Sequence, residues 1–283
     1  MIDCIKNIVP RRFRSSTLEI PVVRLHGAII DSTSLMARTL SLSRYANLLD
    51  KAFAYKEAPA VAVVINSPGG SPVQSHLIFQ RIRDLADEHN KQVLMFAEDV
   101  AASGGYMIAC AGDEIFADPS SIIGSIGVVS ASFGFPELLK KIGVERRVYT
   151  AGKNKVALDP FQPEKKTDID HLKSLQLEVH QTFIDLVKER RAERLSDDPD
   201  IFTGMFWSGM KSIELGLIDG LGDVRSVVKK RFGPDTKLRL ISHSKNLLGL
   251  KMPSGISANM VYTAVDGALM AAEERALWQR YGL

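Results

Sequence analysis

The chain has 283 residues, of which 45% are hydrophobic and 24% charged, the composition of a globular protein with a substantial core. Its 36 basic and 33 acidic residues leave a net charge of +3, too balanced for the concentrated basic stripe that nucleic-acid binding requires. Cys4 and Cys110 form neither a metal-ligand spacing nor a disulfide framework. We therefore expect a reducing, cytoplasmic setting, no metal, no cofactor and no nucleic-acid partner.

Residues 1–18 are predicted to form a basic N-terminal tail. Their apolar residues are isolated from one another and precede Arg11, Arg12 and Arg14. No continuous apolar run is present, so the segment is typical of neither a secretory signal nor a transmembrane helix. A frayed tail is the simpler interpretation. The alternative is a short amphipathic helix with weak affinity for an anionic membrane surface, peripheral to the inner membrane.

The next part of the chain alternates between strand-like and helix-like patterns. Strand-like apolar runs lie at residues 19–30, 60–68, 92–99, 114–118 and 146–152. Residues 73–89 place their apolar side chains on one side of a helix. This alternation favours an α/β fold with a mainly parallel sheet, and the continuous apolar run 61–65 indicates a strand buried on both faces.

A long helix is predicted after this alternating region. Thr167 can cap it, with Asp170 three residues on. Its apolar side chains recur every three or four residues, at Leu172, Leu175, Val179, Phe183 and Leu186. Residues 196–224 are rich in turn-forming residues, and residues 259–282 are predicted to form a separate C-terminal helix. The predicted domains are the tail 1–18, a main domain 19–235 and a C-terminal extension 236–283 for packing or oligomerisation.

Two glycine pairs follow strand-like runs, in "INSPGGS" (65–71) and "ASGGY" (102–106). Glycine permits unusual backbone angles and close approach of amide N–H groups to a ligand. If a helix begins near Pro72, its free amides add partial positive charge at the same place. Two such amides can stabilise an oxyanion, although a glycine pair alone usually marks only a turn.

Ser103 occupies the strand-to-helix position that suits an exposed nucleophile. The ordinary interpretation is a serine that caps the following helix. A nucleophilic serine needs a base, and His26 and His76 lie at strand ends without forming a Ser/His/Asp signature. A lysine kept neutral by desolvation is the other option. From the residues alone the choice between Lys153, Lys155 and neither stays open.

Together these segments resemble the signal peptide peptidase A and SohB family of Ser/Lys serine peptidases. The similarity rests on "NSPGG", "AASGGYMIAC", "IGSIGVV", "YTAGKNK", "DPFQPE" and "FWSGMKSIELGLIDGLGDV", which occur in the family's order between residues 20 and 232. The resemblance implies the fold shared with ClpP and the crotonases, which has repeated ββα units and a curved sheet. It also implies a homo-oligomer built through the long helix.

The resemblance implies a role for each matching residue. Ser103 would be the nucleophile and Lys155, 52 residues later, the general base. The amides of Gly70 and Gly104 would form the oxyanion hole, and Gly69 would allow the turn that aims Gly70. In small members of the family the dyad can come from neighbouring protomers. Whether it forms within one chain or between two is left open here.

The function implied is a serine endopeptidase that hydrolyses apolar or unfolded peptides through an acyl-enzyme. The small and apolar segment 121–133, with Ser125, Ile126 and Gly127, is expected beside the substrate groove. One alternative is a crotonase-like enzyme that acts on acyl-CoA and needs no Ser/Lys pair. Another is an inactive oligomeric scaffold with the same fold.

Overall fold

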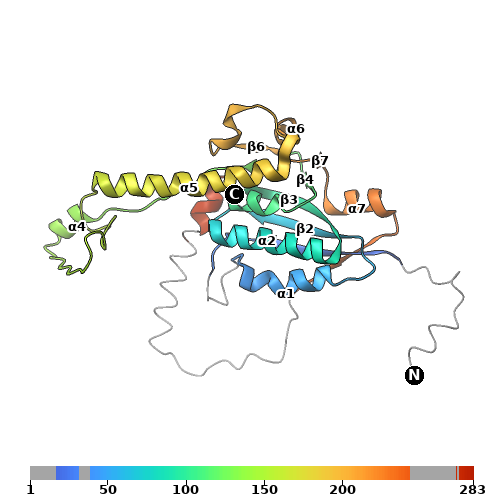
Figure 1. Cartoon of the computed structure of the whole chain (residues 1–283), viewed down its shortest axis with the longest axis horizontal. Coiled ribbons are helices and arrows are strands. Elements are labelled where there is room, and N and C mark those ends of the chain that lie inside the picture. The colour runs from blue at the N-terminus through green and yellow to red at the C-terminus, as the bar shows by residue number, and fades with distance from the viewer. Residues whose placement is uncertain (1–16, 32–38, 243–271, 273) are drawn as a thin grey trace, which may run out of the picture.

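The computed structural model of the chain describes residues 17–31, 39–242, 272 and 274–283. The tail 1–16 and most of the predicted helix 259–282 lie outside the described residues, so these two interpretations stay predictions, as do the predicted domain limits. The described part is one mixed sheet with helices on both of its faces (Figure 1). No helix within the described ranges is both long enough and apolar enough to cross a membrane.

The sheet runs in the order β6-β5-β3-β2-β1-β8, with β4 paired to β3 and β7 paired to β4. Every pairing is parallel except that of β5 with β6. The strands are β1 (Glu19–His26), β2 (Ala60–Ser67), β3 (Gln92–Ala102), β4 (Glu114–Ala117), β5 (Ile122–Gly124), β6 (Phe206–Ser208), β7 (Gly220–Leu221) and β8 (Lys237–Leu240). The predicted α/β fold with a mainly parallel sheet is confirmed.

Helices cover the sheet because its strands are apolar on both faces. Along β2, Val61, Val63 and Ile65 face one core cluster while Val64 and Ala62 face the other. The first cluster is covered by α1, α2, α3 and α5, and the second by α7. The α-helices are α1 (Leu42–Phe53), α2 (Pro72–His89), α3 (Gly104–Ala109), α4 (Pro136–Lys141), α5 (Lys166–Arg191), α6 (Gly209–Glu214) and α7 (Val224–Phe232).

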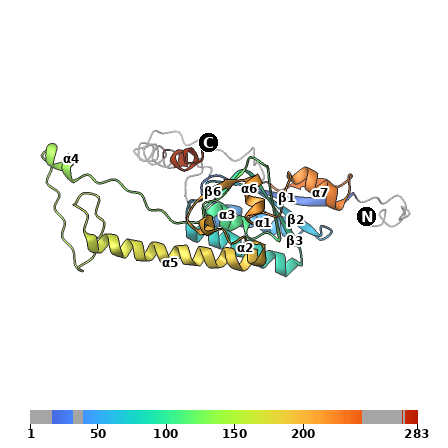
Figure 2. The ribbon, with the colours of Figure 1, turned by 90° about the horizontal axis from the view of Figure 1, so that it is seen from above.

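One segment projects away from the sheet. Its residues 128–178, which we call the arm, comprise α4, the loops around it and the first half of α5, and each of them is at least partly exposed. In Figures 1 and 2, α4 lies at the far end of α5 from the sheet. Only the last turns of α5 enter the core, through Phe183, Leu186 and Val187.

Two arginines fix the C-terminal end of α5 to the body. Arg190 Nε donates to the carbonyl of Cys110 over 2.9 Å, and Arg191 Nε donates to the carbonyl of Gly216 over 2.9 Å. The Arg191 guanidinium, 1% exposed, also forms an ion pair of 2.8 Å with Asp219. These bonds join α5 to the end of α3 and to the turn before β7, so the body alone determines the direction of the arm.

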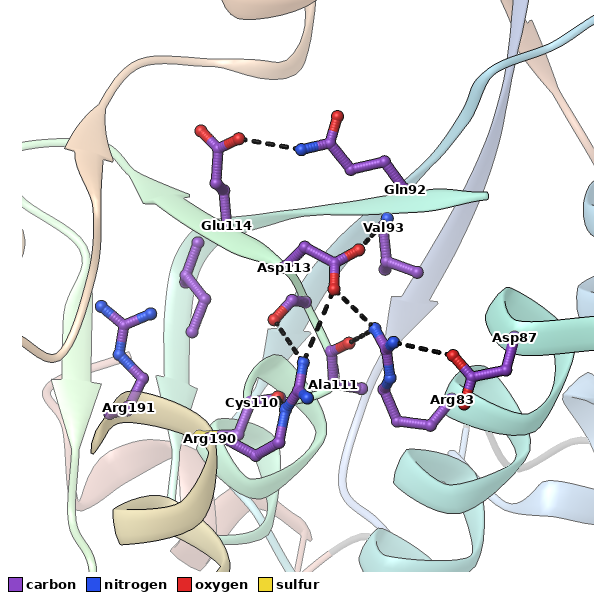
Figure 3. A network of polar contacts seen from close by, with 12 residues as sticks. Arg83, Asp87, Gln92, Val93, Cys110, Ala111, Asp113, Glu114, Arg190 and Arg191 are labelled. Carbon is purple, nitrogen blue, oxygen red and sulfur yellow. Dashed lines mark hydrogen bonds and ion pairs between the residues drawn. The ribbon is translucent and has the colours of Figure 1, made fainter. Parts of the chain in front are cut away.

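A neighbouring ion-pair network extends this anchor across α2 and β4 (Figure 3). Arg83 on α2 binds Asp113 over 2.8 Å and the carbonyl of Ala111 over 3.1 Å. Asp113 also accepts the N–H of Val93 at the start of β3 and lies 3.7 Å from Arg190. The carboxylate of Asp113 therefore connects three elements where α5 joins the sheet.

Two sequence predictions were wrong, both in or beside the arm. Residues 146–152 form a loop and not a strand, because no neighbouring strand lies alongside them to supply ladder hydrogen bonds. Thr167 does not cap α5: the N-cap is Lys165, and the Thr167 hydroxyl donates to Asp168 instead. The predicted apolar stripe of this helix is only partly buried, since Leu175 and Val179 are exposed.

Replacing Arg191 with methionine should destabilise the body strongly. The substitution keeps much of the side-chain volume but removes the buried guanidinium and leaves Asp219 paired only with the half-exposed Arg194, which costs about 2–3 kcal/mol. Urea denaturation followed by circular dichroism measures the change. Lys166→Met, which removes an exposed ion pair with Asp170 on the same helix, is the matched control and should change the free energy of unfolding very little. Equal effects of the two variants would show that Arg191 is not the anchor.

Candidate active site

Ser103 lies in a strained turn between β3 and α3. Its φ of +54° and ψ of −124° fall where a non-glycine residue is rarely found. Its N–H donates to the carbonyl of Gly124 over 2.8 Å, and its carbonyl accepts from Met107 over 3.0 Å. The hydroxyl makes no capping hydrogen bond to α3. The capping interpretation of Ser103 therefore has no support in the geometry.

A second turn, Gly69–Gly70, joins β2 to α2. Its φ values of +101° and +144° lie in a region that side chains disfavour, so glycine is needed at both positions. The turn is held by Ile29, whose N–H donates to the Gly69 carbonyl over 2.9 Å. The carbonyl of Ile29 in turn accepts the N–H of Ser71 over 2.7 Å. The Gly70 amide is thus fixed by the backbone of a neighbouring segment.

The two turns touch through their backbones. A Cβ added to Gly69 would lie 2.7 Å from the Cβ of Ser103 and 3.0 Å from the nitrogen of Gly104. A Cβ added to Gly105 would lie 2.6 Å from the carbonyl oxygen of Ser67. These distances leave no room for side chains between the turns. Close approach therefore explains why both glycine pairs directly follow strands.

Two amides at this contact make no hydrogen bond to the protein. Among the described residues, the N–H groups of Gly70 and Gly104 donate to no acceptor. Gly104 is the first residue of α3, where a helical N–H has no partner within its own helix. A small cavity of about 20 Å³ lies beside them, lined by Gly70, Pro72, Ser103, Gly104, Met107, Gly127, Val128, Val179 and Phe183.

The segment predicted to border the groove follows β5 and lies at this cavity. Ser125 is buried at a φ of +54° and donates its N–H to the Met205 carbonyl over 2.7 Å. Ile126 is buried, and its carbonyl lies 3.0 Å from Nε2 of His180 on α5. Gly127 lines the cavity itself. The structure therefore brings together Gly69, Gly70, Ser103, Gly104 and this segment.

Three contributions to the site were not predicted from the sequence. His180 holds Ile126 from α5, and Val179 beside it closes one wall of the cavity. Ser75 on α2 is fully buried, and its Oγ would lie 2.2 Å from a Cβ added to Gly104. The Ser75 hydroxyl donates to the carbonyl of Ser71 over 2.8 Å. Val179 and His180 lie more than fifty residues after β5 in the sequence. No local sequence pattern could therefore place them at the site.

Lys155 is not near Ser103 in a single chain. It lies exposed in the arm, three residues before Leu158, whose N–H donates to Asp168 at the start of α5. Val179, which lines the Ser103 cavity, comes 179 − 168 = 11 residues later, about 16 Å along the helix. Figures 1 and 2 place that end of α5 away from the sheet.

The other candidate bases are also outside the cavity. His26, at the end of β1, stacks on Trp278 with ring centroids 5.7 Å apart. His76 on α2 stacks on Phe79 with centroids 6.2 Å apart. Neither histidine is among the described residues that line the cavity of Ser103, and Lys153 lies in the arm beside Lys155. Within the part of the chain that the structure describes, one copy thus presents a serine and two amides without acceptors, and none of the expected bases lines the cavity.

Comparison with known proteins places these features in a family context. The sequence model of peptidase family S49 matches residues 86–232. The chain is 33% identical to a putative protease of Methanocaldococcus jannaschii, over 66% of this chain and 59% of that protein. It is 29% identical to the chloroplastic serine protease SPPA of Arabidopsis thaliana, over 86% of this chain and 37% of that protein.

A further relative carries a different name. The chain is 64% identical, over 99% of its length, to a protein of Brucella abortus named Na(+)/H(+) antiporter NhaA. It covers 39% of that protein, so it spans about two fifths of the relative's length. The name belongs to that longer protein as a whole.

Gly69→Ala should destabilise the fold more than Gly152→Ala. Both glycines have a strongly positive φ, +101° and +109°, but a Cβ at Gly152 meets nothing within 4 Å. Gly152→Ala therefore adds backbone strain alone, whereas Gly69→Ala adds a clash with Ser103 that costs about 1–3 kcal/mol more. Chemical denaturation of both variants measures the difference. Equal losses would mean that the two turns do not touch in solution.

Proposed function

The chain belongs to peptidase family S49, and we propose that it hydrolyses peptide bonds with Ser103 as nucleophile and Lys155 as general base. The observation that carries this proposal is the contact between the two turns. It brings a serine without a capping bond next to two amides without acceptors. Family membership favours peptide substrates over the acyl-CoA alternative.

The reaction would proceed in two steps. Ser103 Oγ attacks the carbonyl carbon of the scissile bond while the base takes its proton, and the amides of Gly70 and Gly104 donate to the developing oxyanion. The leaving amine takes the proton from the base. A water molecule, activated by the same base, then hydrolyses the acyl-enzyme and frees Ser103. Removing one donor from such an oxyanion hole costs about 3 kcal/mol of transition-state stabilisation.

We further propose that Lys155 reaches the Ser103 of a second copy of the chain. The arm supports this assignment because Lys155 lies in its loop before α5. The end of α5 nearest this loop lies away from the sheet (Figures 1 and 2), while Arg191 anchors the other end to the body. A lysine acts as a base only when neutral, and burial favours the neutral form. Packing of the arm against a neighbouring body would remove Lys155 from water.

The surface of the arm supports a homo-oligomer. Large apolar side chains stand exposed along it, including Phe133, Ile142, Tyr149 and Leu177. Monomeric proteins rarely expose so many large apolar side chains along one segment, whereas interfaces between subunits bury them. Assembly would therefore cover these side chains and complete the dyad in the same step.

The small cavity beside Ser103 suggests the substrate preference. Its volume of about 20 Å³ gives room for about one water-sized group, and its wall is apolar where Met107, Val179 and Phe183 form it. Such a cavity suits alanine or another small residue at the position before the cut. We therefore propose that the enzyme prefers peptides with a small apolar residue immediately before the scissile bond.

Ser103→Ala and Lys155→Ala should each abolish turnover of a fluorogenic peptide that has alanine immediately before the scissile bond. Mixing the two inactive variants in equal amounts, after reversible dissociation, should restore activity at about a quarter of the sites, because half of the serines meet half of the lysines across an interface. Lys153→Ala is the matched control and should retain activity. Analytical ultracentrifugation checks that every variant assembles.

Failure of the mixture to regain activity, with both variants assembled, would place the base within the same chain. Retention of activity by Lys155→Ala would make another residue the base. Wild-type protein that assembles but cleaves no peptide in a broad panel would favour the inactive-scaffold alternative.

Val179→Ala should relax the preference for small residues. The substitution removes two methyl groups from the cavity wall on α5, at a side chain that is partly exposed, so the body keeps its core. The ratio of kcat/KM for leucine to that for alanine before the cut should rise about tenfold. Gln181→Ala, at an exposed position on the same helix outside the cavity, is the control. An unchanged ratio would mean that another surface selects the residue.

A further inference from the structure

The register between β2 and β3 shifts just before the site. Ile65 is paired with Ala97, but Ser67 is paired with Ala101. Over this interval β2 advances by two residues and β3 by four, so β3 carries two extra residues at this bulge. The two strands are neighbours in the sheet on both sides of this shift.

This shift sets the alignment of the two turns. Continued from Ser67 and Ala101, the register brings Gly69 opposite Ser103, as their close contact requires. Without the two extra residues, the register of Ile65 with Ala97 would bring Gly69 opposite Ala101. The serine would then lie two residues, about 7 Å, beyond its present partner.

Asn66 fills the place where the shift interrupts the ladder. It is 2% exposed and lies between the last paired residues of β2. Its Oδ1 accepts the N–H of Val100 over 3.2 Å, and its Nδ2 donates to Oδ2 of Asp99 over 2.5 Å. Its own carbonyl accepts the N–H of Gly27 over 3.0 Å. The side chain of Asn66 thus bonds both backbone and side chain of the bulged strand.

We propose that Asn66 and Asp99 are positioning residues that hold the register shift and thereby align the Ser103 nucleophile with the amides of Gly70 and Gly104. The proposal rests on the function proposed above for these three residues. The amide of Asn66 takes the place of the ladder bond that the bulge removes. Asp99 accepts from it through a carboxylate, which makes a shorter and stronger hydrogen bond than a neutral acceptor.

Exchange of the two side chains tests the pair. In Asn66→Asp two carboxylates face each other at hydrogen-bond distance, so the bulge should open and kcat should fall by about tenfold or more at neutral pH. In Asp99→Asn an oxygen acceptor for Asn66 remains, so the loss should be small. The double variant restores an amide opposite a carboxylate in reverse order, and kcat should return to within about threefold of wild type.

Two readouts separate positioning from general stability. Lowering the pH should rescue Asn66→Asp relative to wild type, because two facing carboxylates raise the pKa of one of them and the shared proton restores a hydrogen bond. KM should change less than kcat, since the cavity wall is unaltered. Gln80→Glu, which creates the same pairing with Asp84 on the exposed face of α2, is the control and should leave kcat unchanged.

Hydrogen exchange of the Val100 amide gives a result that does not depend on turnover. Exchange should accelerate in Asn66→Asp and slow again in the double variant, even if the wild type proves to have no peptidase activity. Wild-type kcat in Asn66→Asp at neutral pH would overturn the proposal. Restored protection of Val100 in the double variant without restored kcat, in a protein whose wild type is active, would also overturn it and leave the pair a purely structural role.

Discussion

The direct contact of two backbone turns is the constraint on which the rest of the site depends. Gly69 and Ser103 approach so closely that no side chain fits between their turns, and the same approach leaves the neighbouring amides of Gly70 and Gly104 without partners. Parallel strands make this possible because their carboxyl ends meet at one edge of the sheet. The turn of Ser103 is strained. It is held because the N–H of Ser103 donates to the carbonyl of Gly124 and the carbonyl of Ser103 accepts the N–H of Met107.

The body and the arm have different roles in the molecule. The body buries an apolar sheet between helices, whereas no residue of the arm, 128–178, belongs to either core cluster. Arg190 and Arg191 fix the C-terminal end of α5, the helix whose first half belongs to the arm, to the body. The stability of the fold and the strength of the proposed assembly can therefore vary independently, because different side chains would determine each.

Local features of the site could be predicted from the sequence, and distant ones could not. Ser103 and the glycine pairs follow apolar strands directly, so their neighbours in the chain reveal the turns. Residues 146–152 contain a strand-like apolar run but form a loop, because a strand needs a partner that the described part of the arm does not offer. The contacts of Asn66 and of His180 depend on a register and on a helix packing that no neighbouring residues encode.

The junction between α3 and α5 also contains a buried cysteine, Cys110, whose thiol does not react while the junction is closed. Burial raises the pKa of the Cys110 thiol to about 12, so the folded protein holds it protonated and out of reach of alkylating reagents. The carbonyl of the same residue accepts from Arg190, which fixes the base of α5. A thiol reagent can react with Cys110 only after α5 has separated from the body. The rate at which Cys110 is labelled would therefore measure how often the junction between α3 and α5 opens.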